Sequence, residues 1–184
     1  MAREAIPATL YAVLTSSQYC WHFASLMIND FAVARALHVL ALVHWIGGVA
    51  MVTTIVLPRA RALADPHAAL TAFEAFEGPF AVQARFSILL AGLSGFYMLN
   101  KLQAWTLLLD PTFWWLALMV AVWAVFALMV FVLEPLVVHR LFHDYALRDK
   151  ERAFSLAIRL HAVALTISCV AIVAGVLGAQ GALP

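Results

Sequence analysis

Residues 31–57, FAVARALHVLALVHWIGGVAMVTTIVL, form an apolar stretch that decides the fold, and Arg35 is the one Lys, Arg, Asp or Glu in it. At 1.5 Å per residue, a helix of this length crosses the roughly 30 Å hydrocarbon layer of a bilayer. Three further stretches, 86–109, 113–138 and 155–177, are similarly apolar and long enough to cross. The sequence therefore predicts an all-α integral membrane protein whose residues 31–184 form a four-helix bundle in contact with lipid.

The composition supports the same conclusion. Of the 184 residues, 65 % are hydrophobic and 11 % are charged, whereas soluble domains have about 45–50 % and about 25 %. One small core cannot bury this excess, so a bilayer is the expected solvent. The net charge of +1 gives no reason to expect a nucleic-acid partner. Cys20 and Cys169 lie far apart in the sequence, so we expect neither a disulfide framework nor a thiolate metal site.

Positive charges predict the orientation. If the spans alternate in direction, the loops 59–85 and 139–159 share one face, which then holds eight of the eleven Lys and Arg residues: Arg59, Arg61, Arg85, Arg140, Arg148, Lys150, Arg152 and Arg159. The positive-inside rule places this face in the cytoplasm and the C-terminus outside. We expect a multi-pass protein of a bacterial-type inner (cell) membrane.

Two segments outside the spans are expected to be helical. Residues 1–30 form an N-terminal segment in which the apolar run 7–28 is interrupted by Thr15-Ser16-Ser17-Gln18 and by His22. An amphipathic helix at the outer surface fits this mixture better than a fifth span, and the charges do not decide between the two. We expect this segment to be retained, because no clear signal-peptide cleavage site follows. Residues 62–84 predict a short cytoplasmic helix that ends at Gly78-Pro79.

Histidines mark the candidate site. At 100° per residue, His38, Ala41, His44, Trp45 and Gly48 fall within an arc of about 120° on the first helix. His161 begins a stripe of small residues on the fourth span, and the second span carries such a stripe at i+4 spacing: Ser87, Ala91 and Gly95. Small residues allow close helix packing in lipid, and they also leave a slot for a flat ligand.

An imidazole in hydrocarbon loses several kcal/mol of hydration unless it is hydrogen-bonded or ligated. A single membrane histidine is more often an interhelical hydrogen bond than a ligand. Three of them without a nearby carboxylate or thiolate favour haem iron over zinc or calcium. The sequence therefore predicts His38, His44 and His161 as metal ligands.

Depth limits which histidines pair. Counted from the outer helix ends, His38, His44 and His161 lie about 10, 18 and 25 Å deep at 1.5 Å per residue. A helix tilt of about 20°, together with helix ends that lie a few residues from their expected positions, would bring His44 and His161 within range of one haem. His38 would then bind a haem alone, with His22, or with a non-histidine partner.

Two polar features near the inner ends of the helices have simpler expected roles. Glu134 is expected to pair with Arg85 or another cation at that end, and a proton-entry group is the alternative. His139 and His143 have the i, i+4 spacing of a metal chelate. Beside Arg140 and Asp144 they are expected to belong to a solvated rim instead.

The stretch HVLALVHWIGG resembles the first-helix signature of the CopD/HemJ-like family of small four-helix haem-binding membrane proteins. In that signature a histidine is followed by Trp seven residues later and by Gly ten residues later, here His38, Trp45 and Gly48. The second span is also similar, with Arg85 at its start and Gly95 within it. The resemblance implies that His38 is the ligand position. The extra His44 stands where HemJ-like sequences have a small hydroxyl residue, which indicates a second ligand or a second haem.

The expected function is that of a membrane-embedded b-type cytochrome, which holds haem b between the first and fourth spans and relays electrons to or from quinone or a partner subunit. Trp45 and Gly48 would lie against the ring. If the haem lies toward the cytoplasmic face, an arginine there would neutralise a propionate: Arg59, Arg85, Arg140 or Arg159. A homo-oligomer is a further class of partner. By the resemblance, the alternatives are a HemJ-like protoporphyrinogen IX oxidase and a CopD-like copper transport protein. The six methionines form no M-x-x-M ladder, which argues against copper. A structural subunit whose histidines only hydrogen-bond is the third alternative.

Overall fold

Residues 29–183 are described by a computed structural model, except for the side chains of residues 137–139. The predicted surface helix 7–28 and His22 lie outside the described residues. The chain has two units, 1–33 and 34–184, and the second contains the bundle. Its described residues form helices and no strand, which confirms the all-α prediction.

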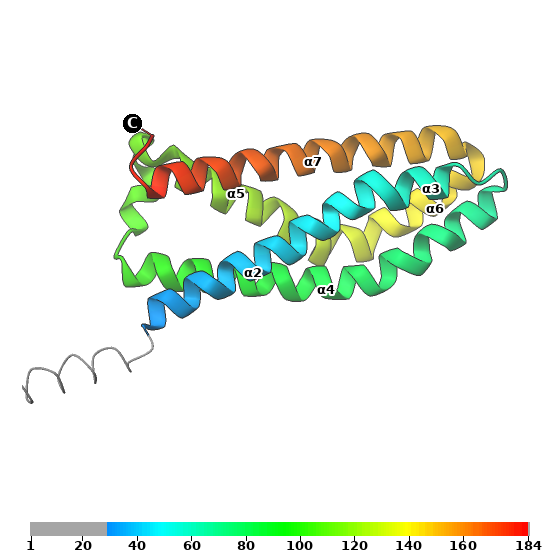
Figure 1. Cartoon of the computed structure of the whole chain (residues 1–184). Coiled ribbons are helices and arrows are strands. Elements are labelled where there is room, and N and C mark those ends of the chain that lie inside the picture. The colour runs from blue at the N-terminus through cyan, green and yellow to red at the C-terminus, as the bar shows by residue number, and fades with distance from the viewer. Residues whose placement is uncertain (1–28, 184) are drawn as a thin grey trace, which may run out of the picture. The chain divides into compact units, whose positions relative to one another are not determined.

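Four helical segments are long and apolar enough to cross a membrane: Asp30–Arg61, Pro66–Lys101, Pro111–Leu136 and Lys150–Ala179. They correspond in order to the four predicted spans, as expected for a multi-pass membrane protein. Figure 1 shows α5 (Trp114–Leu128) beside α7 (Lys150–Ala179), while α2 (Asp30–Met51) crosses α4 (Pro66–Lys101). The short helix α3 (Leu57–Arg61) lies with α6 (His139–Arg148) at the opposite end from the C-terminus. Because α3, α6 and α7 carry many of the arginines, we call this the basic end.

Helix α4 differs from the expectation. The segments predicted as a short loop helix and as the span 86–109 form one helix of 36 residues, which continues through Gly78 and Pro79. A proline in a helix interior removes a hydrogen bond and costs about 3 kcal/mol. Phe73 before it and Ile88 after it are both buried, and this packing holds the helix together across the proline. The helix ends at Lys101, and the 3-10 turn Trp105–Leu109 forms part of the connection to the third span.

Two stretches of the spans are widened into π-helix. The segment Val52–Val56 lies just before Pro58, and the segment Met129–Val138 contains Pro135. In each case the proline lacks the N–H that would close a regular α-helical turn. The hydroxyls of Thr53 and Thr54 donate to backbone oxygens four residues earlier, at 2.6 and 2.7 Å.

Two clusters of side chains form the interior. The basic-end cluster contains the fully buried Leu57 and Phe154, with the rings of Phe73 and Phe142 packed against Phe154 at 6.1 and 5.4 Å between centroids. The Trp45 cluster occupies the middle of the bundle and contains Trp45, Val49 and Ile88, surrounded by Leu42, Ile46, Phe80, Trp123, Phe126, Ala127, Val130 and Leu165.

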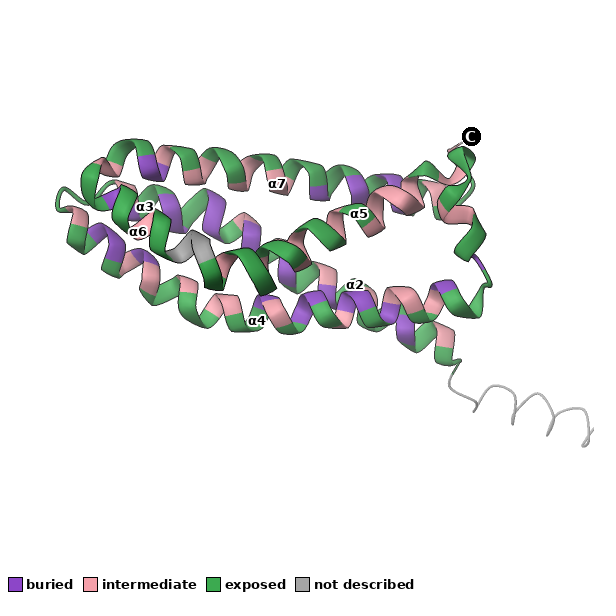
Figure 2. Ribbon diagram, turned by 180° about the vertical axis from the view of Figure 1, so that it is seen from behind, coloured by how far each residue is buried: buried purple, intermediate pink, exposed green. Residues whose placement is uncertain are grey.

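Elsewhere the helices keep their apolar side chains on the outside. No residue of α5 is buried, and Figure 2 shows its ribbon without a buried position. Exposed Val, Leu and Ile residues also cover α2 and α7. Such a surface fits contact with a lipid bilayer, because lipid tails are as apolar as these side chains.

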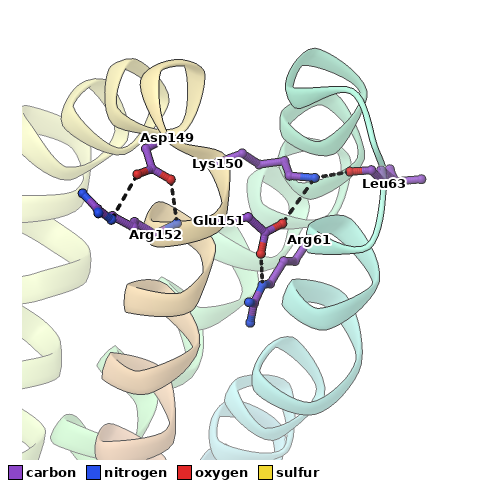
Figure 3. A network of polar contacts seen from close by, with 6 residues as sticks. All are labelled: Arg61, Leu63, Asp149, Lys150, Glu151 and Arg152. Atoms are coloured by element: carbon purple, nitrogen blue, oxygen red, sulfur yellow. Dashed lines mark hydrogen bonds and ion pairs between the residues drawn. The ribbon is translucent and has the colours of Figure 1, made fainter.

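Ion pairs join the helices at the basic end (Figure 3). Arg61 Nε donates to Glu151 Oε2 at 2.8 Å, and Lys150 Nζ donates to the Leu63 carbonyl oxygen. Asp149 caps α7 by accepting from the backbone N–H of Arg152 at 3.1 Å. These contacts fix the start of α7 beside the turn that follows α3.

Candidate functional site

His38 on α2 is held by α4. Its Nδ1 lies 2.8 Å from the carbonyl oxygen of Ala91 and 3.2 Å from Ser94 Oγ. A carbonyl oxygen only accepts hydrogen bonds, so the imidazole hydrogen is on Nδ1. Among the described residues, the structure gives Nε2 no hydrogen-bond partner. The lone pair of Nε2 is therefore available to a metal.

Three residues of α4 form a cradle around this ring, and we call Ala91, Ser94 and Gly95 the His38 cradle. Ser94 Oγ donates to the Leu90 carbonyl oxygen at 2.6 Å, so the same oxygen can accept from His38. A Cβ on Gly95 would stand 3.2 Å from Cε1 of His38. The absence of a side chain at Gly95 gives the imidazole its room.

His44, two turns further along α2, contacts Ser87 of α4. Its Nδ1 lies 2.8 Å from Ser87 Oγ. Ser87 is buried, whereas His44 is exposed on the surface of the bundle. The predicted stripe Ser87, Ala91 and Gly95 thus faces α2, and each of its members contacts a histidine.

His161 on α7 bonds within its own helix. Its Nδ1 donates to the carbonyl oxygen of Ala157 at 2.9 Å, so it carries the hydrogen on Nδ1 as His38 does. In the described part of the chain its Nε2 has no hydrogen-bond partner. His161 therefore forms no hydrogen bond to another described helix.

The three histidines do not form one cluster. In the described residues, no group of three His, Cys, Asp or Glu side chains could hold a metal ion. Leu165 packs against the Trp45 cluster, and His161 lies one turn earlier on α7. It is displaced toward the basic end by about 6 Å, at 1.5 Å per residue.

Trp45 and Gly48, which were expected at the edge of a haem, serve packing. Trp45 is 2 % exposed and meets the Phe126 ring edge-on at 4.7 Å. The Phe80 ring lies where a Cβ of Gly48 would be. Protein side chains surround Trp45 at this level, and a contact of Trp45 or Gly48 with a haem stays a prediction.

Arg85 forms an ion pair with Glu134, as the sequence predicted. Its Nη2 lies 2.5 Å from Glu134 Oε2, and its Nε donates to the Val130 carbonyl oxygen at 3.4 Å. Glu134 lines a hollow of about 280 Å³ together with Glu74 and Glu77. Because Glu134 neutralises Arg85, the expected propionate contact would require this pair to break.

The remaining predicted histidines lie at or beyond the limits of the description. His143 Nδ1 is 3.8 Å from Asp144 Oδ1, and the two side chains are 43 % and 72 % exposed, as expected for a rim. The side chain of His139 lies outside the described residues, so the predicted pair with His143 stays a prediction.

The donor chemistry at His38 fits haem iron, because histidines that bind a metal through one nitrogen usually donate the other N–H to a carbonyl or carboxylate oxygen. The hydroxyl partners were missed: Ser87 was identified only as a small residue, and Ser94 was not identified at all. Ser87 lies four residues before Ala91 and Ser94 lies three residues after it, so helical spacing alone places both hydroxyls on the face that carries Ala91. Comparison of the chain with models of protein families, with curated proteins and with solved structures gives no match.

Proposed function

We propose that the protein is a membrane-embedded b-type cytochrome, in which His38 binds haem b through Nε2 and electrons pass to or from quinone or a partner subunit. The observation that carries this proposal is the hydrogen bond from His38 Nδ1 to the Ala91 carbonyl oxygen. It fixes the position of the ring and the protonation state that iron requires.

A hydrogen-bonding role alone leaves His38 incompletely satisfied. The bond to Ala91 uses one ring nitrogen, and Nε2 has no protein partner among the described residues. Iron at Nε2 would use the ring nitrogen that the protein leaves open while Nδ1 donates to a carbonyl oxygen, which is the usual arrangement of a metal-binding histidine. This supports ligation beside the structural contact.

The haem, when bound, supplies one-electron chemistry. The His38 cradle holds the imidazole from α4, and the carbonyl of Ala91 raises its basicity as a ligand. The Trp45 cluster, about two turns after His38 on α2, excludes water from the centre of the bundle. His161 has the same protonation state and is a second candidate ligand, so one or two haems are compatible with the proposal.

The test is an optical spectrum of the purified protein, oxidised and then reduced with dithionite, from cells well supplied with haem. We expect a b-type α band that is lost in His38→Ala. The matched control is His67→Ala, because His67 is exposed in the first turn of α4 and its loss should leave the band unchanged. A colourless wild-type protein overturns the proposal, and haem content per chain counts the sites.

A further inference from the structure

His44 differs from His38 and His161 in its hydrogen-bond partner. Those two donate Nδ1–H to carbonyl oxygens, whereas the partner of His44 Nδ1 is the hydroxyl of Ser87. A hydroxyl both donates and accepts. The position of the hydrogen on His44 therefore depends on what else Ser87 can bond.

Within the described residues, His44 is the only hydrogen-bond partner of the buried Ser87 hydroxyl. If His44 donated to Ser87, the hydroxyl hydrogen would be buried without an acceptor, at a cost of about 1–3 kcal/mol. Ser87 therefore donates to Nδ1, and His44 carries its own hydrogen on Nε2. In this state Nε2 has no lone pair in the ring plane for iron, which removes His44 from the expected ligand set.

The Nε2–H group of His44 belongs to an exposed part of a membrane-spanning helix. Val43, one residue before, is 66 % exposed, and Leu40, one turn before, is 63 % exposed. Gly47, on the next turn of the same face, is exposed, and a Cβ built on it would meet no atom within 4 Å. The imidazole thus offers a hydrogen-bond donor beside open space on a face that lipid would cover.

We propose that His44 Nε2–H donates a hydrogen bond to a carbonyl oxygen of a lipid-soluble quinone. The quinone binds on the exposed face of α2 that carries Leu40, Val43 and Gly47. This inference rests on the proposed function, because a haem protein in a bilayer requires an electron partner that reaches it through lipid or from another subunit. A quinone has the required features: it is flat and apolar, it carries carbonyl acceptors, and it diffuses in the bilayer.

The experiment titrates decylubiquinone into the purified full chain in quinone-free nanodiscs and measures binding by quenching of tryptophan fluorescence. We expect His44→Leu to raise the dissociation constant for decylubiquinone at least tenfold, while the haem α band persists. His44→Gln keeps an N–H donor and should stay within about threefold of wild type. With carbonyl-¹³C-labelled quinone, the infrared carbonyl stretch should move to lower wavenumber on binding to wild type and not in the presence of His44→Leu.

The outcomes separate this inference from the proposed function. Equal quinone affinity in wild type and His44→Leu overturns the inference. Loss of the α band in His44→Leu, with the fold intact by circular dichroism, makes His44 an iron ligand and also overturns it, while the cytochrome proposal stands. A wild-type protein without haem overturns the cytochrome proposal, and the fluorescence titration then still decides whether His44 binds quinone. Ser87→Ala provides a second variant, in which loss of the hydroxyl donor should weaken quinone binding severalfold.

Discussion

Gly95 on α4 lies so close to His38 on α2 that an added Cβ would stand 3.2 Å from Cε1 and 3.4 Å from Nδ1 of the imidazole. The distance to Cε1 is shorter than ordinary van der Waals contact, so a methyl group at this position would push the ring. The bond from His38 to the Ala91 carbonyl depends on the same ring position. The geometry of His38 is therefore set by the absence of a side chain on the neighbouring helix.

The first prediction concerns Gly95→Ala. We expect the displaced imidazole to hold haem less well, and the haem content of the purified protein to fall at least twofold. The control is Gly47→Ala, where a Cβ meets no atom within 4 Å. Both changes raise helix propensity, by about 1 kcal/mol, so a lower haem content in Gly95→Ala alone reports on the ring. Equal content in the two variants contradicts the assignment of the His38 cradle.

The second prediction concerns the packing of Gly92 against Trp123, and it does not depend on haem. A Cβ on Gly92 would stand 2.6 Å from the indole ring, whose Nε1 donates to the Ile88 carbonyl oxygen at 2.9 Å. The ring cannot move away without losing this bond. We expect Gly92→Ala to lower the free energy of unfolding by about 1–3 kcal/mol, as overpacked cores do. Thermal unfolding in detergent measures it, and a stability equal to that of wild type would show that the two helices separate easily here.

The third prediction concerns the ion pair of Arg85 and Glu134, which is 34 % and 21 % exposed. Removing one partner leaves a partly buried charge unpaired, so Glu134→Gln should destabilise the protein by about 1–2 kcal/mol, less than for a fully buried pair. Glu74→Gln, at the same hollow, is the control and should have little effect. A double-mutant cycle with Arg85→Gln measures the coupling between the two residues, and additive effects would refute the pairing.

The fourth prediction concerns the start of α7. Asp149 accepts a hydrogen bond from the backbone N–H of Arg152 and so caps the helix. Replacing such a residue with alanine costs about 1 kcal/mol, whereas asparagine caps equally well. Asp149→Ala should therefore unfold at a lower temperature than Asp149→Asn. If both variants fall equally, the charge next to Arg152 matters and the cap does not.

The sequence predicted the features that depend on local composition. Hydropathy located the four spans, the spacing of Ser87, Ala91 and Gly95 placed them on one face of α4, and the isolated carboxylate Glu134 was correctly expected to pair with Arg85. Each of these follows from the cost of placing polar or bulky groups in hydrocarbon. Such costs are nearly independent of the rest of the fold.

Other features depend on tertiary packing and could not be predicted. Gly78-Pro79 is a strong terminator locally, but buried residues on both sides keep α4 continuous. Trp45 fits a cofactor edge by its position in the motif, yet Phe126 of another helix covers it. The protonation of His38 and His44 depends on whether a carbonyl or a hydroxyl faces each ring, which is fixed only when α2 and α4 come together.

The continuity of α4 has a consequence for how the chain is stabilised. Its 36 residues extend about 54 Å at 1.5 Å per residue, against about 30 Å of hydrocarbon, so most of its charged first half, with Glu74 and Glu77, must project into headgroups and water. There the burial of Leu57 and Phe154 gains energy from expelling water, a driving force that is missing among lipid tails. Urea should therefore unfold the projecting parts of the helices before the parts that lie in the hydrocarbon layer. The chain should accordingly unfold in two stages, first in water and then in lipid.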